Sequence, residues 1–506
     1  MGSSNPPSLS KINDDTLILV LSCMPVRSVL AIRQTCKRML ALSRTRIIWH
    51  NAYVREVLPN GFPFPCRALL TMPTAELERA VCRSMRIGKF WRSSASPRRL
   101  VDFQASHGSA VNDVRFLPGY EGNRVVTVAK GIWSVIAVWE LPPCAECACV
   151  RKLAEWAPRG AIFAGFAVNS DPSSDGLVAT SVNAEGRQRI EILSLVREND
   201  IESLRPIKTI NSTWKPIALK GDFIAYSDDC LKTIVMNWRT GATALLRGSD
   251  ELIDQHFNYN RCLQIVFTYK SVLVVRARSI ELFAEPVLSS PRAPQRTLNP
   301  LARHSFGWID GVSINVQVRA RAAGEPAPPA EPLAILLRSE SDDPWTSDVR
   351  TLDLYVLEPN PLFGGAPAPP EGAASGESPY AFPPVRSPLS SPSERGFLRC
   401  TAIILGPYGT AVWIQPRPAR FIDLTALDVH SSETQAPEAA RAKETLAAAM
   451  FCGLLWERNP GTGGGPRGLW TQSLGSSYWN AIDYCEELGR IALASSQGMV
   501  TILELG

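Results

Sequence analysis

The sequence predicts a multidomain protein that combines α and all-β parts: three short N-terminal helices and a linker helix precede a β-propeller of seven blades. Three observations predict this fold. The 506 residues suffice for more than one core, since a single domain usually holds roughly 100 to 200 residues. Apolar residues recur at helical spacing near the N-terminus, whereas short β-rich phrases repeat along the rest. The 40 prolines and 34 glycines indicate many turns and some disordered inserts.

Three helices are expected in the N-terminal segment. The first covers residues 14–23, with Asn13 and Asp14 as the candidates for its N-cap. Pro25 interrupts this pattern, and a second helix follows, whose apolar face consists of Val29, Ile32, Cys36 and Met39. A third helix is expected over residues 47–58. Because a unit of roughly 40 residues seldom has a sufficient core of its own, an exposed apolar face here predicts a partner.

The segment LSKINDDTLILVLSCMPVRSVLAIRQTCKRMLALSRTRIIWHNAYVRE resembles an F-box throughout its length. The marker positions of that family are occupied in order by Ile12–Asn13, Met24–Pro25, Cys36–Lys37 and Trp49. Asn13 departs from the proline that usually follows the leading leucine, while the apolar spacing is kept. The resemblance implies that this face docks on a Skp-family adaptor, which joins a cullin scaffold that carries the ubiquitin-transfer machinery.

Nine apolar residues are the expected adaptor contacts: Ile12, Leu17, Ile18, Leu21, Met24, Val29, Leu30, Ile32 and Trp49. Some of them must be internal core instead, and periodicity alone does not divide the two groups. A competing interpretation is that these positions form a helical cap packed on the domain behind. The ordered series of family markers favours docking over the cap.

The chain divides into an F-box at residues 8–58, a helical linker at 59–97 and a propeller at 98–506. Within the linker, the segment from Pro73 to Trp91 predicts a helix. Its first turn is acidic and its later turns are basic, which the helix dipole favours. The expected role of this helix is to hold the adaptor end at a fixed distance and angle from the substrate end.

Short alternating phrases mark the blades. Four of them, near residues 138, 191, 234 and 280, recur roughly every 45 to 50 residues, which is close to the blade period of a propeller. Three later phrases, near residues 354, 421 and 501, are farther apart. Pro- and Gly-rich inserts account for the excess, and they are predicted at residues 322–332, 364–396 and 431–468. Subtracting the inserts leaves seven comparable units.

Two further predictions concern the inserts. Residues 438–451 are predicted to form a short helix within the third insert, with Ala448 to Phe451 as a possible tether to the ring. Ser378, Ser387 and Ser391 are each followed by proline in a segment whose composition favours disorder. Proline-directed phosphorylation could occur there, although such dipeptides are common in disordered tracts.

The first unit, SHGSAVNDVRFLPGYEGNRVVTVAKGIWSVIAVWEL, resembles a WD-repeat blade. The residues that carry the resemblance are His107 at the place of the structural histidine, Phe116 and Pro118 at a strand end, and Trp139–Glu140 for the terminal Trp-Asp pair. The resemblance implies that strands from both ends of the chain close the ring, here residues 98–103 with 500–505. Closure removes sheet edges that would invite aggregation.

Other kinds of site have weaker support. Cys144, Cys147 and Cys149 could supply three thiolates to zinc, but no fourth Cys or His lies close by, so a cysteine-containing loop is favoured. The twelve cysteines suit reduced thiols at apolar positions. The glycine run at 461–468 lacks the ending of a phosphate loop, and the five histidines give little support to a hydrolase triad. No metal or cofactor is expected.

The net charge of +5 is too diffuse to indicate a nucleic-acid surface, and no apolar run is long enough for a membrane span or a secretory signal. The cytoplasm or nucleus is therefore the expected location. The leading hypothesis is a non-catalytic substrate receptor of an SCF-type ubiquitin ligase, whose target protein and target-binding residues the sequence does not identify. The alternatives are a propeller scaffold that no longer recruits a ligase and, third, an enzymatic propeller.

Overall fold

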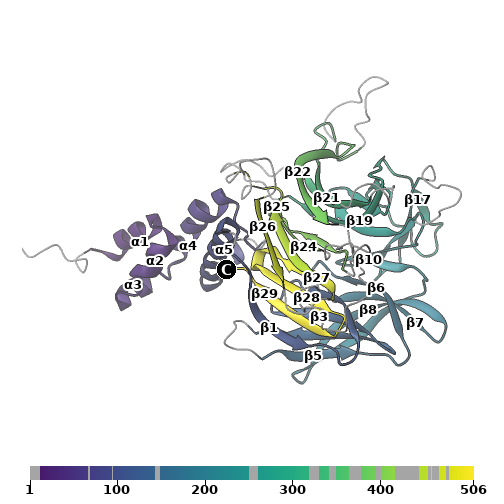
Figure 1. Ribbon diagram of the computed structural model, residues 1–506, viewed down its shortest axis with the longest axis horizontal. Helices are drawn as coiled ribbons and strands as arrows, with labels where there is room; N and C mark the ends of the chain where they lie inside the picture. The colour runs from purple at the N-terminus through teal and green to yellow at the C-terminus, as the bar shows by residue number, and fades with distance from the viewer. Residues whose placement is uncertain are drawn as a thin grey trace, which may run out of the picture.

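The computed structural model describes residues 12–65, 69–93, 95–142, 149–249, 260–317, 330–340, 349–363, 378–394, 400–415, 444–453, 457, 467–473 and 478–506. A set of helices projects from one side of a ring of β-sheets, and helix α5 lies between the two parts (Figure 1). The predicted fold class, a helical N-terminal part followed by a seven-bladed propeller, is confirmed.

Four short α-helices form the outer part of the helical region: α1 (Asp14–Cys23), α2 (Val26–Ile32), α3 (Lys37–Leu42) and α4 (Arg46–Ala52). The Asn13 side chain caps α1 by accepting a hydrogen bond of 2.9 Å from the Thr16 amide. The sequence predicts one helix where the structure has α2 and α3. The chain is extended at Cys36, with φ of −157°, so the apolar face is divided between two helices that meet at an angle.

The third predicted helix begins as α4 and changes its winding. A π-helical turn (Tyr53–Val57) and a 3-10 turn (Leu58–Asn60) follow it, and the segment ends at Gly61, whose φ of 62° favours glycine. The predicted linker helix is present as α5 (Thr74–Ser93). Its buried face includes Leu77 and Ile87, which share one hydrophobic core with α4 and with the propeller.

Seven sheets follow, each a propeller blade. In order from the innermost strand outward, the blades are β2 (Ala110–Phe116), β3 (Arg124–Lys130), β4 (Ser134–Glu140) and β5 (Arg151–Trp156); β6 (Ile162–Val168), β7 (Val178–Ala184), β8 (Arg187–Glu198) and β9 (Ile201–Ile210); β10 (Lys215–Lys220), β11 (Phe223–Ser227), β12 (Lys232–Asn237), β13 (Thr243–Arg247) and β17 (Arg296–Leu298); β14 (Cys262–Thr268), β15 (Ser271–Arg276), β16 (Ile280–Ala284) and β18 (Ala302–His304); β19 (Trp308–Val316), β20 (Leu333–Glu340), β21 (Val349–Leu357) and β22 (Val385–Glu394); β23 (Ile403–Leu405), β24 (Thr410–Gln415), β25 (Thr445–Met450) and β26 (Arg467–Ser473); and β27 (Trp479–Cys485), β28 (Arg490–Ser495), β29 (Met499–Glu504) and β1 (Arg98–Gln104).

The seventh blade closes the ring as the sequence predicts. Its outermost strand, β1, comes from the beginning of the propeller and pairs antiparallel with β29 at the end of the chain, from Arg98 opposite Glu504 to Gln104 opposite Met499. The two strands lie side by side in Figure 1. This pairing joins the two ends of the propeller in one blade and covers the edge that β29 would otherwise expose.

The sixth blade corrects one prediction from the sequence. Residues 445–450, expected as part of a helix in an insert, are strand β25 between β24 and β26. Ala447, Ala448 and Ala449 are completely buried there. Alanine favours helices in isolation, but burial between two strands and two neighbouring blades decides the conformation here. The β-rich phrase near residue 421 lies outside the described residues, as do residues 431–443 of the predicted insert.

The fifth blade corrects a second prediction. Residues 385–394, expected within a disordered insert, form the outermost strand β22, paired with β21. Pro388 and Pro392 are tolerated because an outermost strand needs to donate to one neighbour only. Ser387 and Ser391 therefore lie in a strand. Ser378, just before it, donates to the Tyr380 carbonyl at 2.7 Å. Residues 364–377 and most of 322–332 lie outside the described part.

One of the WD-repeat markers, Trp139, makes a buried hydrogen bond in blade 1. The indole Nε1 of Trp139 donates to the Thr127 hydroxyl at 2.9 Å, and both residues are buried. His107, by contrast, is exposed. The blade is therefore fixed by the Trp139–Thr127 pair and by its apolar core, without a histidine from the preceding loop.

Candidate functional site

The nine predicted adaptor contacts fall into two groups. Four of them, Leu17, Leu21, Val29 and Trp49, are buried within the helical part. The other five, Ile12, Ile18, Met24, Leu30 and Ile32, retain exposed surface. The buried group maintains the shape of the helices, since the Trp49 indole also donates to the Ser43 carbonyl at 2.8 Å. The five exposed or half-buried residues are the ones that a partner can reach.

Sequence periodicity missed the most exposed apolar residues of this region. Leu19 and Val20 on α1 are 66% and 50% exposed, and Ile47 at the start of α4 is 52% exposed. One signal was available: residues 17–21 read LILVL, so α1 is apolar on every side. A helix that is apolar all round must be covered on more than one face, and α4 covers only one of them.

Polar contacts join the helices into one unit. Arg38 of α3 pairs with Asp14 of α1 at 2.7 Å. The Arg55 guanidinium donates to the Ser22 carbonyl at 3.1 Å, and the Glu56 carboxylate accepts from the Val26 amide at 2.8 Å. These contacts hold α1 beside the segment that follows α4. The exposed apolar side chains are therefore presented by a fixed scaffold.

The family that explains this helical arrangement is the F-box domain, which matches residues 9–51. Residues 9–51 form an F-box domain. The search of curated proteins gives no significant match. Among solved structures, the chain is similar to the β-propeller domain of Cps50 (Swd1) from Myceliophteria thermophila, with 9% identity and a TM-score of 0.45, over 81% of this chain and all of that one.

The side chain of Arg33 connects the F-box to α5. Arg33, at the end of α2, pairs with Glu78 of α5 at 2.6 Å, and its guanidinium lies 5.4 Å from the centre of the Trp49 ring. Arg46 of α4 donates to the carbonyls of Leu69 and Met72 just before α5. The F-box thus continues into the linker through several independent contacts.

A second set of contacts ties the linker to blades 6 and 7. The Tyr408 hydroxyl donates to the Phe64 carbonyl at 2.7 Å. The Tyr408 amide in turn donates to the Glu486 carboxylate at 2.7 Å, and the Thr410 amide donates to the same carboxylate at 2.9 Å. Burial raises the pKa of Glu486 to about 7, against the opposing effect of these donors. This joint brings the linker, blade 6 and blade 7 together without an intervening hinge loop.

The central channel of the propeller contains a polar cavity of about 620 Å³. Its lining comes mostly from the innermost strands of blades 1 to 6, together with the turn between β11 and β12. Among the described strands, β2, β6, β10, β14, β19 and β27 each have a β-bulge near their start. Such bulges change the direction of side chains at the rim. Charged residues in the lining include the pair Lys215–Asp229 at 2.9 Å and Asp310, which Arg338 holds at 2.7 Å.

The channel cavity and the F-box lie at opposite ends of the innermost strands. β2 and β27 run in the same direction, because Asn480 bonds to Val111 near their starts and the Phe116 amide bonds to Asp483 near their ends. α5 packs on the turn that follows the end of β27, where a Cβ on Gly489 would meet the Ile87 side chain at 2.9 Å. The cavity opens at the starts of these strands and so faces away from α5.

Exposed apolar side chains lie on the same rim as the channel mouth. Ile132 and Trp133, at the turn between β3 and β4, are 89% and 44% exposed. Next to this turn lies the loop before β2, since Ser109 is 3.1 Å from a Cβ placed on Gly131. Lys130 and Arg159 flank the turn and form no ion pair with any described residue. We refer to Lys130, Ile132, Trp133 and Arg159 as the rim patch.

Metal-ligand clusters are absent from the part of the chain that the structure describes. The searched residues contain no group of three or more His, Cys, Asp or Glu side chains placed to hold a metal. Cys144 and Cys147 lie outside the described part, and Cys149 is exposed and unbridged. None of the described helices is both long and apolar enough to cross a membrane.

Proposed function

We propose that this chain is the substrate-recognition subunit of an SCF-type ubiquitin ligase. The F-box docks on a Skp-family adaptor, which connects it to a cullin, and the propeller binds the target protein. The observation that carries the proposal is the F-box at residues 9–51 with Leu19, Val20 and Ile47 exposed on its surface. Apolar side chains gathered on a fixed helical scaffold are typical of a protein interface.

The mechanism requires no covalent chemistry from this chain. The assembly holds a bound target near a ubiquitin-conjugating enzyme, and the raised effective concentration accelerates transfer to the target's lysines. A rigid connection between docking face and target face serves this role, because a freely rotating target would spend little time in reach. The contacts of α5 with both the F-box and the propeller support such a connection.

The Asn13 departure from the usual F-box proline is compatible with an adaptor face on α1. Asn13 caps α1 through its side chain, so the helix starts at the expected place. This observation favours ligase recruitment over the alternative of a scaffold that has lost it. We include Ile12, Ile18, Met24, Leu30 and Ile32 in the proposed adaptor face, together with Leu19 and Val20.

Binding to a purified adaptor–cullin complex tests the proposal. The double variant Leu19→Asp and Val20→Asp places two charges on the exposed side of α1, and we expect binding to weaken by a factor of at least about 100, since each desolvated charge costs more than about 1.4 kcal/mol. The matched control is Ile201→Asp, because Ile201 is 70% exposed at the start of β9 on the propeller. Undiminished binding by the α1 variant, or an equal loss in the Ile201 variant, would refute this assignment.

A further inference from the structure

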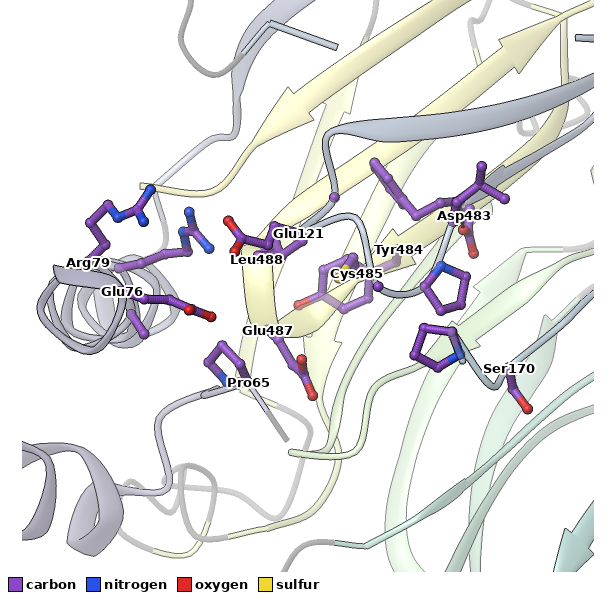
Figure 2. Close-up of a pocket in the computed structure, with 18 of the residues that line it drawn as sticks. Pro65, Glu76, Arg79, Glu121, Ser170, Asp483, Tyr484, Cys485, Glu487 and Leu488 are labelled. Carbon is purple, nitrogen blue, oxygen red and sulfur yellow. Dashed lines mark hydrogen bonds between the residues drawn. The ribbon is translucent and has the colours of Figure 1, made fainter. Parts of the chain in front are cut away.

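A second cavity lies where α5 meets the propeller (Figure 2). Its volume is about 580 Å³, which is within the range of small-molecule sites. One wall is the face of α5 that carries Glu76, Arg79 and Arg83. The opposite wall is formed by the turn from Phe116 to Gly122 and by Pro172 of blade 2, and residues 483–488 of blade 7 form the floor. None of these residues belongs to the adaptor face or to the channel mouth.

The cavity contains two cations with unused hydrogen-bonding capacity. Arg79 donates through Nε to the Ala75 carbonyl of its own helix at 3.2 Å, and its terminal nitrogens have no further bond in the described structure. Arg83, one turn later, forms no ion pair or hydrogen bond with any described residue, although it is half-buried. Burial lowers the pKa of Arg83, as do the nearby Arg490 and Arg86, while Glu121 and Glu504 act in the opposite direction.

Acidic side chains also line the cavity, and they limit what can bind. Glu76 and Glu487 have interactions of their own, and Asp483 pairs with Arg115 at 3.4 Å. Glu121 lies across the cavity from α5 in Figure 2, and its backbone has a φ of 50°. Its charge raises the pKa of Arg83, although the two side chains form no ion pair. An anion beside Arg83 is therefore attracted by two guanidinium groups and repelled by Glu121.

Apolar surface completes the site. Leu117, Pro118 and Pro172 line the wall opposite α5, and Leu488 lies on the floor, so the apolar part exceeds the charged part. We propose that this cavity binds a small amphipathic anion: a carboxylate, sulfonate or phosphate group on an apolar body. The anionic group lies between Arg79 and Arg83, and the apolar body lies against Pro118, Pro172 and Leu488. Charge-assisted hydrogen bonds to arginine provide the orientation.

Such a ligand would contact α5 and three blades at once. It binds the assembled joint and not the separated parts, so it stabilises the joint in proportion to its concentration. This inference does not depend on the proposed ligase function, because the cavity is formed by the linker and the propeller alone.

The probe for this site is 8-anilinonaphthalene-1-sulfonate, which carries one sulfonate on an aromatic body, titrated into the full chain and followed by fluorescence. We expect saturable binding at one site. The double variant Arg79→Ala and Arg83→Ala is expected to weaken binding at least about ten-fold, since it removes charge-assisted hydrogen bonds. Glu121→Gln is expected to strengthen it, because the variant removes the repelling carboxylate. Lys89→Ala, on α5 outside the cavity, is the matched control and should change nothing.

Two measurements keep the test independent of folding. Thermal unfolding of each variant shows whether the joint is intact. The uncharged analogue N-phenyl-1-naphthylamine has the same rings without the sulfonate, and its weaker binding should be insensitive to the arginine variants. Equal affinity of the wild type and the double arginine variant for the sulfonate would overturn the proposal. So would weaker binding by Glu121→Gln, because an anion site cannot gain from that carboxylate.

Discussion

The joint at Glu486 makes a quantitative prediction about stability and pH. The Glu486 side chain is 2% exposed and accepts hydrogen bonds from the Tyr408 and Thr410 amides and from the Thr410 hydroxyl. Glu486→Ala leaves two buried amides without an acceptor, and each such amide costs about 1–3 kcal/mol. We therefore expect the free energy of unfolding to fall by about 3–5 kcal/mol. Glu486→Gln retains the volume but offers one carbonyl oxygen for two amides, so its loss should be smaller.

The pH dependence separates the charge of Glu486 from its hydrogen bonds. Burial raises the pKa of this carboxyl from 4.5 to about 7, so between these values the folded state binds more protons than the unfolded state. The free energy of unfolding then decreases as pH rises, by about 3 kcal/mol in total at 1.36 kcal/mol per unit. The contribution is fully present below pH 4.5 and is lost as pH rises through about 7.

Urea unfolding of the wild type and of Glu486→Gln, followed by tryptophan fluorescence at pH 5 and at pH 8, measures this effect. Glutamine does not titrate, so the stability advantage of the wild type over the variant should shrink by about 2.5 kcal/mol between the two pH values. An advantage independent of pH would mean that the carboxyl is not perturbed. An advantage that grows with pH would mean that the amide donors outweigh burial and lower the pKa, which would refute our reasoning.

Two further predictions concern the propeller. Thr127→Val leaves the buried Trp139 indole without its acceptor, so the free energy of unfolding in urea titrations should fall by about 1–3 kcal/mol. The control His107→Ala should change it by less than about 0.5 kcal/mol, because His107 is exposed, and equal effects of the two variants would contradict this account of blade 1. If the rim patch binds the target, the double variant Ile132→Asp and Trp133→Ala should recover less of the proteins that accumulate on the full chain under proteasome inhibition. Adaptor binding should stay unchanged, and a loss of both kinds of binding would indicate misfolding.

The sequence predicted the parts of the fold that depend on local pattern. The linker helix and most blades follow from periodicity and spacing, and the closure of the ring by residues 98–103 follows from the resemblance to a WD-repeat propeller. β25 was missed because its alanines have a local preference for helix that the neighbouring strands override. β22 was missed because serine and proline in an outermost strand have the same composition as a disordered insert.

The candidate sites were less predictable, for a geometric reason. Helical spacing identifies that Leu17 and Leu21 share one face, and that Leu19 and Val20 share another, but it does not say which face the fold buries. The answer depends on α4, which is distant in sequence. The ligand cavity is still less visible, since Arg79, Glu121 and Leu488 come from three separate segments.

The continuous core from F-box to propeller changes what the linker helix does. A spacer would expose most of α5, yet Leu77, Val81 and Ile87 are fully buried and belong to the same core as Trp49 of the F-box and Leu503 of β29. The angle between docking face and channel mouth is then fixed by packing, because a buried helix cannot rotate without opening a cavity at a cost of several kcal/mol. The joint cavity beside Arg83 borders this packed region, so a ligand bound there would stabilise the angle that the packing sets.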